Sequence, residues 1–462
     1  MPRLYLPDLI LANGRASCGV GLLVADDGSV LGEATPESAP HATRIRLTNK
    51  ALLPGLANAH SHTFQRLFRA RAEGRRIGGD TFWTWREQMY RAAAFCAPGD
   101  LYDVARATFL EMLASGITLV GEFHYLHNDP AGNPYADPNE LAHQVIRAAQ
   151  SVGIRICLLR AAYMRAGFEK APHPGQRRFY ESEDAYLRNL EALIKTTAAG
   201  ANVTVGSAPH SIRAVPLPAQ KNIAAFAQSR ELPLHLHISE QPAENSACLA
   251  EYGQTPVALV AAHGILTPRT TLVHAIHLTE SEFAQVAAAG NTICSCPTTE
   301  RNLGDGIFPA DTAARLGISV AYGTDSQAQI DILEDARQNE YHLRLIQRER
   351  GILDQFGDQP IAARLFTAAT ANGYRALGVA GGSLAAGQPA DFFTVSLDDP
   401  ALLGVDVASL ESQAVFALNR AAIRDVAVAG VLVLTDGHHP LDDEIRTRYR
   451  AVQQRFATQE AS

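Results

Sequence analysis

The chain has 462 residues, of which 47% are hydrophobic, so it can bury the core of a large barrel together with a smaller domain. Its formal net charge of -8 argues against binding to nucleic acid, because a phosphate backbone is bound by clustered Lys and Arg. No stretch supplies about 18 apolar residues in a row, so we expect no membrane-spanning helix and no membrane partner.

The N-terminal segment and the cysteines bear on the cellular compartment. Residues 1–17 lack the basic start, the apolar stretch and the small-residue cleavage site of a secretory signal peptide. Six cysteines are too few for a disulfide framework in a chain of this length. We therefore expect a cytoplasmic protein.

The two ends of the chain predict a small β-sandwich domain. Residues 1–54 contain short strand-like runs with turn signals at ANG (12–14) and DDG (26–28). Residues 377–462 contain similar runs with Gly-rich turns, followed by a polar helix at 441–459. We expect the first segment and the last to pack together.

The region between residues 55 and 376 predicts a (β/α)8 TIM-like barrel of the α/β class. Apolar runs alternate there with helix-like segments, as in repeated βα units on a parallel sheet. The eight runs lie at 52–62, 117–125, 154–163, 203–211, 232–240, 270–278, 291–299 and 318–326. An open doubly wound sheet is the alternative, but it would not bring the first, fifth, sixth and eighth strand ends to one point. Closure makes strands one and eight neighbours.

Candidate metal ligands stand at the ends of three of these runs. His60 and His62, in NAHSH, alternate along one strand, so both can point to the same face and hold one ion. His237, in HLHISE, and Asp325, in YGTDS, end two later strands. Imidazole and carboxylate ligands suit Zn²⁺ or Fe²⁺, and the lack of a nearby Cys₄ or Cys₂His₂ set favours an open catalytic site over a closed structural one.

Two further polar groups end strands of the same barrel. Glu240 completes an HxxE pattern with His237, and His274 ends the sixth run in LVHAIHL. His235 lies on the same strand as His237 and faces the same side, so spacing alone leaves the choice of ligand open.

The order HxH, HxxE, His and Asp, with the flanking segments PGLANAHSH and GSLAAGQPAD, resembles the amidohydrolase superfamily, in particular its deaminase branch. Within that branch, the segments TFWTWREQMY (81–90), GEFHYLHNDPAGNPY (121–135), HISEQPAEN (237–245) and CPTTERNLGDGIFP (296–309) resemble the formimidoylglutamate deiminases. The resemblance covers nearly the whole chain. It implies metal-dependent hydrolysis of N-formimino-L-glutamate to N-formyl-L-glutamate and ammonia, a step of histidine degradation.

The resemblance also implies roles for single residues. The ligands of one divalent ion, usually Zn²⁺, would be His60, His62, His237 and Asp325. The HxxE pattern of the family favours His237 over His235. Asp325 and Glu240 would transfer protons, and His274 would stabilise charge at the reacting centre. A bound Zn²⁺ lowers the pKa of water from about 15.7 to about 7, which supplies a nucleophile at neutral pH.

The implied substrate is a small dicarboxylate, which an acidic protein can hold only with placed donors. The positions that match the family's substrate contacts are Gln65, Arg86, Tyr125, His210 and Arg213. The planar fork of Arg suits a carboxylate. As alternatives, Arg86 stacks on Trp83 or Trp85, and Tyr125 is a core aromatic. Glu300 either lines the site or is a helix-cap or surface carboxylate.

Two departures from the family bear on the substrate. Residues 67–80 are more basic than expected, and Gln327 stands where a histidine is often found. We therefore keep a second enzyme class open, the deamination of an aromatic ring such as guanine or an adenosine derivative. A noncatalytic metal-binding barrel would lack a proton-transfer residue, whereas all three candidates are present. By resemblance, we expect a homodimer.

Overall fold

In the computed structural model, which describes residues 1–73, 82–198, 200 and 202–461, eight parallel strands form a barrel. They follow one another in chain order and are β6 Leu56–Ser61, β7 Ile117–His124, β8 Arg155–Ala162, β9 Val203–Pro209, β10 Leu234–Ile238, β11 Thr270–His274, β12 Thr292–Ser295 and β13 Ser319–Tyr322. A parallel bridge between Ser61 and Asp325 brings the first and last strand ends together. The predicted fold class is confirmed.

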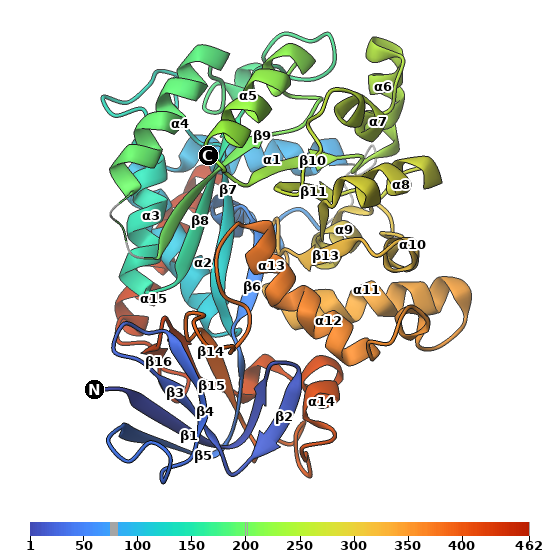
Figure 1. The fold of residues 1–462 in the computed structure, drawn as a ribbon. Helices are drawn as coiled ribbons and strands as arrows, with labels where there is room; N and C mark the ends of the chain where they lie inside the picture. The colour runs from blue at the N-terminus through green and yellow to red at the C-terminus, as the bar shows by residue number, and fades with distance from the viewer. Residues whose placement is uncertain (74–81, 199, 201, 462) are drawn as a thin grey trace.

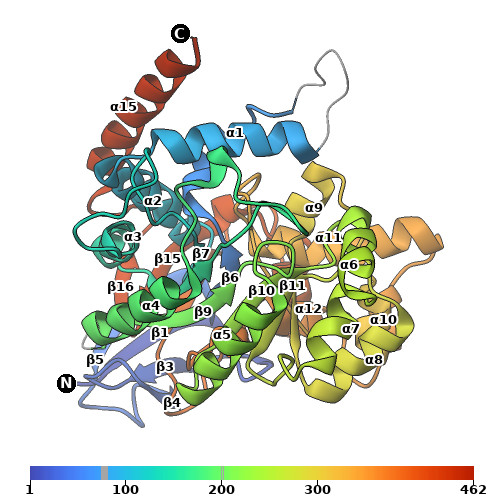
Figure 2. The same ribbon diagram turned by 90° about the horizontal axis from the view of Figure 1, so that it is seen from above.

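Helices surround the barrel and cover its outer face (Figure 2). They are α1 Phe82–Phe95, α2 Pro98–Leu113, α3 Glu140–Val152, α4 Glu183–Thr197, α5 Leu217–Ser229, α6 Pro242–Tyr252, α7 Pro256–Ala262, α8 Glu280–Ala289, α9 Pro297–Leu303, α10 Ala310–Arg315, α11 Ile332–Gln347, α12 Ile361–Ala369 and α13 Ala371–Ala376. Because both faces of the barrel strands are covered, β6, β7, β10 and β11 consist entirely of buried residues.

The ends of the chain meet in one mixed sheet of eight strands, which lies below the barrel in Figure 1. Its strands are β1 Arg3–Ala12, β2 Arg15–Cys18, β3 Gly21–Val24, β4 Val30–Ala34, β5 Thr43–Pro54, β14 Phe392–Ser396, β15 Ile423–Val428 and β16 Val431–Leu434. Antiparallel pairing of β5 with β14 joins the N-terminal strands to the C-terminal ones. The expected terminal domain is thus one hydrogen-bonded sheet, and β5 leads straight into β6.

The remaining C-terminal elements are α14 Leu410–Phe416 and α15 Asp442–Ala461. The latter packs beside α2 and reaches the segment that follows the HxH motif, the 3-10 helix η1 (Thr63–Phe68). There Arg66 donates a hydrogen bond of 3.0 Å to the hydroxyl of Tyr449. The end of the chain therefore supports the backbone near the first metal ligands.

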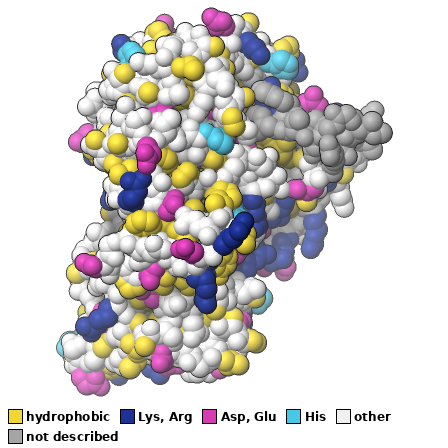
Figure 3. All heavy atoms as spheres, turned by 90° about the vertical axis from the view of Figure 1, so that its right-hand side faces the viewer, with side chains coloured by type: hydrophobic (Ala, Val, Ile, Leu, Met, Phe, Trp, Pro, Cys, Tyr) yellow, Lys and Arg dark blue, Asp and Glu magenta, His cyan; other side chains and the backbone are white. Residues whose placement is uncertain are grey.

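The surface mixes side chains of all kinds. On the face in Figure 3, hydrophobic side chains are scattered among acidic and basic ones, as is usual for a protein surface. In the part of the chain that the structure describes, no helix combines the length and the apolar composition that crossing a bilayer requires.

Candidate metal centre and active site

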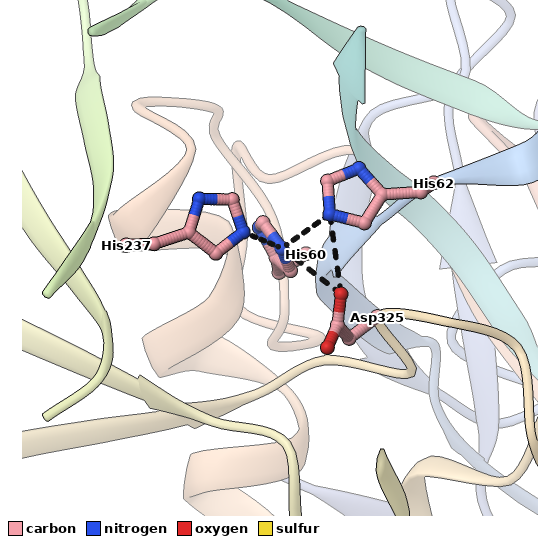
Figure 4. A group of neighbouring side chains, drawn as sticks. All are labelled: His60, His62, His237 and Asp325. Carbon is pink, nitrogen blue, oxygen red and sulfur yellow. Dashed lines mark hydrogen bonds and ion pairs between the residues drawn. The ribbon is translucent and has the colours of Figure 1, made fainter. Parts of the chain in front are cut away.

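Three imidazole nitrogens and one carboxylate oxygen converge at the carboxyl end of the barrel (Figure 4). The Nε2 atom of His60, on β6, lies 3.1 Å from Nε2 of His62 and 3.1 Å from Nε2 of His237, on β10. Asp325, just after β13, places Oδ1 3.2 Å from His62 Nε2 and 3.4 Å from His60 Nε2. The four ligand atoms all lie within 4.8 Å of one another, and the four residues are buried.

Backbone carbonyl groups fix the orientation of two of these rings. Nδ1 of His62 lies 2.9 Å from the carbonyl oxygen of Phe123, and Nδ1 of His237 lies 3.0 Å from that of His210. Because a carbonyl oxygen only accepts, Nδ1 carries the hydrogen in both rings and Nε2 keeps its lone pair. Such outer partners commonly orient histidine ligands of metals.

The protonation states suit metal binding. Burial lowers the pKa of His60 to about 3 and holds the pKa of His237 well below its usual value. Burial alone would raise the pKa of Asp325, but its interactions with His60 and His62 outweigh this and hold the pKa well below the usual range. At neutral pH His60 and His237 are therefore neutral and Asp325 is a carboxylate, as metal ligands must be.

The spacing of the donors fits one divalent ion. Ligands held at about 2.0–2.1 Å in a tetrahedral arrangement are about 3.3 Å apart, close to the separations found here. Without a cation, the lone pairs of the Nε2 atoms would face one another and a carboxylate oxygen, which is unfavourable in a buried site. The donor set therefore fits Zn²⁺ or a similar ion.

A glycine lets the first and last strands approach at this centre. A Cβ atom on Gly323 would lie 2.7 Å from Cβ of His60 and 2.8 Å from its carbonyl oxygen, closer than such atoms approach in proteins. The N–H of Asp325 then donates to the carbonyl of His60, and the N–H of His62 donates to the carbonyl of Asp325, both at 3.0 Å. Glycine in YGTDS thus allows ligands far apart in sequence to share one ion.

The two other candidate catalytic groups flank the ligands. His274, the last residue of β11, places Nε2 3.9 Å from Oε1 of Glu240 and 3.9 Å from Oδ2 of Asp325. Burial lowers the pKa of His274, but a hydrogen bond with Glu300 and the charges of Glu240 and Asp325 outweigh it and raise the pKa to about 10. The ring can therefore donate hydrogen bonds toward the centre.

Unusual backbone conformations mark the same strand ends. Ser239, His274, Ala275 and Asp325 have φ values of 50°, 70°, 51° and 45°. Non-glycine residues seldom adopt the left-handed region, and each such residue costs about 1–3 kcal/mol. Strain of this kind persists where the surrounding structure imposes it, which is common at functional sites.

The ligands open into a cavity at the carboxyl end of the barrel. The residues that line it are His62, Gln65, Trp85, Arg86, Met89, Tyr125, Tyr163, Phe179, His210, Arg213, His237, Glu240, His274, Leu303 and Asp325. Of the residues predicted from the sequence, only His60 is absent from this lining, because it lies beneath the other ligands. The structure thus brings the predicted metal, acid–base and substrate-binding residues to one place.

Hydrogen bonds organise one side of the cavity. The side-chain amide of Gln65 donates to the hydroxyl of Tyr125 at 2.7 Å, while Oε1 of Gln65 is buried without a hydrogen-bond partner among the described residues. Burial raises the pKa of Tyr125 well above its usual value, so the phenol stays neutral. The His210 ring stacks on that of His237 with centroids 4.6 Å apart. Oε1 of Gln65 can therefore accept a hydrogen bond from a donor group of the substrate.

The sequence matches the Amidohydrolase family over residues 51–433. The chain belongs to the amidohydrolase family. The predicted resemblance is therefore confirmed. Because the family is metal-dependent, a metal-binding role follows for the buried site of His60, His62, His237 and Asp325.

Relatives of this amidohydrolase include several deaminases. The formimidoylglutamate deiminase of Pseudomonas aeruginosa is 39% identical over 441 residues, which cover 95% of this chain and 96% of that protein. The 8-oxoguanine deaminase of the same species is 30% identical over 401 residues, 85% of this chain and 84% of that protein. Among solved structures, an amidohydrolase from Brucella melitensis has a TM-score of 0.90 at 33% identity, covering 98% of this chain and 100% of that chain.

Several alternatives left open by the sequence are answered by this amidohydrolase structure. His235 donates a hydrogen bond from Nε2 to the carbonyl of Ala376, 2.8 Å away, and does not reach the metal centre. Arg86 faces the cavity, with its guanidinium carbon 5.6 Å from the centre of the Tyr90 ring, whereas stacking on Trp83 concerns a side chain outside the described residues.

The sequence departs from the family at two places, Gln327 and residues 67–80. The first does not line the cavity, and the second lies in part outside the described residues. Gln327 is fully buried, donates to the Ser61 hydroxyl at 2.8 Å and to the Asp325 carbonyl at 3.0 Å, and is not among the cavity-lining residues. Its amide ties the first strand to the last instead of meeting substrate. Of residues 67–80, positions 74–80 lie outside the described residues.

The apolar part of the cavity was not predicted from the sequence, nor was the role of Glu122 in holding the backbone around His62. Trp85, Met89, Tyr163, Phe179 and Leu303 line the cavity, but no motif marks them as more than core residues. Glu122, in GEFHY, accepts hydrogen bonds from the Ser61 hydroxyl and from the backbone and hydroxyl of Thr63, all at 2.7 Å. It holds the backbone on both sides of His62. An acidic residue inside an apolar strand was the available signal.

Proposed function

We propose that this amidohydrolase converts N-formimino-L-glutamate and water to N-formyl-L-glutamate and ammonia. The observation that carries this proposal is the presence of Arg86 and Arg213 in the same cavity as the metal ligands and Glu240. Two partly buried guanidinium groups beside the reacting centre suit a substrate that carries carboxylates, because the planar fork of Arg binds a carboxylate through two hydrogen bonds. The 39% identical relative is a formimidoylglutamate deiminase.

The two arginines would hold the two carboxylates of the substrate. Arg213 lies close to the reacting groups, with Nη2 3.6 Å from Oε2 of Glu240, whereas Arg86 comes from α1 on another wall. A guanidinium group binds a carboxylate through two parallel hydrogen bonds, which fixes both position and orientation. Tyr125 and His210 supply further polar contacts along the cavity.

The formimino group would lie over the metal centre, within reach of Gln65. Oε1 of Gln65 lacks a partner among the described residues and can accept from an N–H of the amidine. When bound, a divalent ion supplies the Lewis acidity that makes water nucleophilic near pH 7. We propose that the ion is Zn²⁺, which the three imidazoles and one carboxylate suit.

The protein groups then move protons and stabilise charge. Both protons of the water end on the departing nitrogen: Glu240 carries one from the attacking water to it, and Asp325 accepts the other from the new hydroxyl group and releases it to that nitrogen, which leaves as ammonia. The amidine carbon gains oxygen and loses nitrogen, so the product is a formamide. His274, with Nε2 between Glu240 and Asp325, donates a hydrogen bond to the oxygen where negative charge develops.

Ammonia release tests the proposal directly. The purified protein, with and without chelator treatment and Zn²⁺ restoration, is incubated with N-formimino-L-glutamate, guanine, 8-oxoguanine or adenosine. We expect metal-dependent ammonia release from the formimino acid, at a kcat/KM far above that for the rings. Release from a ring substrate alone would assign the chain to ring deamination, and release from none would contradict both activities.

We also propose that the protein is a cytoplasmic homodimer whose only partner in catalysis is this small dicarboxylate. The proposal for the compartment is supported by the cysteines, all six of which are free and five of which are buried. The homodimer rests on the family resemblance. Light scattering on the eluting protein measures the oligomeric state, and fractionation of the source cells locates the protein.

A further inference from the structure

Glu300 contacts the side of His274 that faces away from the cavity. It lies on α9, which follows β12, and its Oε1 is 3.3 Å from Nδ1 of His274. The same Oε1 accepts the backbone N–H of Cys296 at 2.7 Å, and Ser295 donates its hydroxyl to Oε2 at 3.2 Å. Glu300 is only 2% exposed and does not line the cavity.

These contacts make Nδ1 of His274 a donor to Glu300, while the hydrogen on Nε2 points toward the cavity. Since Oε1 already accepts the N–H of Cys296, it faces the imidazole as an acceptor, and Nδ1 of His274 is the donor. The ring is thereby held with Nε2 toward Glu240 and Asp325, 3.9 Å from each. A carboxylate behind a catalytic imidazole holds the hydrogen on Nδ1 and fixes the rotation of the ring, as in hydrolytic triads on other folds.

We propose that Glu300 is a positioning residue that holds His274 in the orientation needed for the hydrolysis. The catalytic role of His274 in this inference rests on the proposed function. The hydrogen bond between Glu300 and His274 is independent of that function. Glu300 acts through His274 and touches neither substrate nor metal ligands. It therefore affects turnover more than substrate binding.

Two other roles for Glu300 make different predictions. As a simple cap of α9, Glu300 would contribute stability through Cys296 and Ser295 but would not affect the state of His274. As a ligand of a second ion, it would act together with His274 and Cys296, whose donor atoms also lie within 4.8 Å of one another. A thiol ligand must lose its proton, and burial raises the pKa of Cys296 well above its usual value. This opposes a second ion at these three residues.

The backbone of Cys296 makes the conservative variant informative. In Glu300→Gln, an amide nitrogen facing the Cys296 N–H would place two donors together, so the amide oxygen takes the position of Oε1. The variant therefore keeps the acceptor for Nδ1 of His274 and loses only the charge. Glu300→Asp withdraws the acceptor by one methylene, and Glu300→Ala removes it. Glu282→Gln is the matched control, because Glu282 is also 2% exposed and lies in the first turn of α8, where it accepts hydrogen bonds from Thr279 and Thr255.

The first readout is the hydrogen on Nδ1 of His274, and it requires no catalysis. Protein labelled with ¹⁵N-histidine, with and without metal, is studied by long-range ¹H–¹⁵N spectra, with His274→Asn used for assignment. We expect a protonated Nδ1 in the wild type and in Glu300→Gln, and loss of that signal in Glu300→Asp and Glu300→Ala. An unchanged His274 spectrum in Glu300→Asp would overturn the proposal and leave a helix cap.

The second readout is the division of the effect between kcat and KM. We expect kcat to fall by about 10²-fold in Glu300→Asp and Glu300→Ala and by about tenfold in Glu300→Gln, with KM within about threefold of the wild type. Glu282→Gln should keep its kcat within about twofold. Should Glu300→Ala not fold, Glu300→Asp and Glu300→Gln still decide the ranking, and equal kcat values in these two would overturn the proposal.

Metal analysis closes the remaining alternative. We expect one ion per chain in the wild type and in each Glu300 variant. Two ions in the wild type, one of which is lost in Glu300→Gln, would make Glu300 a ligand and overturn a positioning role. If the formimino acid is not the substrate, the result for the Nδ1 hydrogen of His274 still stands, and the kcat ranking is measured with whichever compound is hydrolysed.

Discussion

Arg213 and Glu240 lie side by side in the cavity, with Nη2 of the arginine 3.6 Å from Oε2 of the glutamate. They follow consecutive barrel strands, β9 and β10, and so belong to neighbouring loops. A group suited to a substrate carboxylate therefore borders the group suited to proton transfer. If these proposed roles hold, this contact couples substrate binding to proton transfer.

Replacing Arg213 should separate binding from metal retention. We expect Arg213→Ala to raise KM for N-formimino-L-glutamate by about 10²-fold, corresponding to about 3 kcal/mol for a buried charged pair, while the metal content is unchanged. Steady-state kinetics and elemental analysis measure the two quantities. Arg230→Ala is the control, because Arg230 is half exposed and pairs with Glu191 on the outer surface. Unaltered KM in Arg213→Ala would remove this residue from the binding site.

Gln327 should tune metal affinity although it does not face the cavity. Its amide donates to the Ser61 hydroxyl and to the Asp325 carbonyl, so Gln327→Ala frees the backbone that presents a metal ligand. We expect the metal affinity to fall by about 10- to 100-fold, as for other groups that support metal ligands. Competition with a chromophoric chelator measures this. Gln329→Ala, at a partly exposed glutamine that accepts a hydrogen bond from Arg301, should leave the affinity as in the wild type.

Gly323 should tolerate no side chain. In Gly323→Ala, the new methyl group meets Cβ and the carbonyl of His60, so either β6 or β13 must shift. We expect a loss of about 1–3 kcal/mol in the free energy of unfolding together with weaker metal binding. Gly99→Ala is the control, because a Cβ there meets nothing within 4 Å. Denaturant titration with and without metal distinguishes the two effects, and a stable variant with normal metal affinity would contradict the steric account.

The buried pair of Arg160 and Glu181 should give a stability term that depends on acid pH. Burial opposes ionisation of Glu181, but the charges of His127 and Arg160 outweigh it and lower the pKa to about 2. Since this folded pKa is below the unfolded value, the contribution is complete above about pH 4.5 and is lost as the pH falls toward 2.

The matching experiment compares the wild type with Glu181→Gln. Through this carboxylate, we expect the wild type to lose about 3 kcal/mol of unfolding free energy between about pH 4.5 and pH 2. The variant should begin less stable at pH 7, because Arg160 is left without its charge partner, and should lack this component. The difference in unfolding free energy between the wild type and Glu181→Gln therefore becomes smaller as the pH falls. A difference that stays constant over this range would contradict the assigned pKa.

Much of the metal centre could be predicted because all four ligands stand at the ends of strands, His60 and His62 at one and His237 and Asp325 at two others. Closure of a parallel barrel brings the first and last strand ends together, so His60 and Asp325 are neighbours even though the sequence separates them widely. The choice between His235 and His237 could not be made from alternation, because both face the same side. It depends on depth along the barrel axis, where His235 lies at the level of Ala376.

The contacts between neighbouring loops were less accessible from the sequence. Glu300 meets His274 only because α9 turns back toward the end of β11, and neither strand pattern records that turn. Trp85 and Met89 reach the cavity from α1, whose position depends on packing across the barrel mouth. Side-chain direction, not the order of elements, limited the prediction.

β5, which leads into β6, pairs with a strand from the far end of the chain, and this affects when the metal site can form during synthesis. β5 pairs with β14, and the ligands extend from His60 to Asp325, so a growing polypeptide cannot finish either the terminal sheet or the ion site while it is still short. Most of the polypeptide must have left the ribosome before the first two histidines gain their partners. Loading of the ion is accordingly a late event, and a prematurely terminated product would retain two histidines without a coordination sphere.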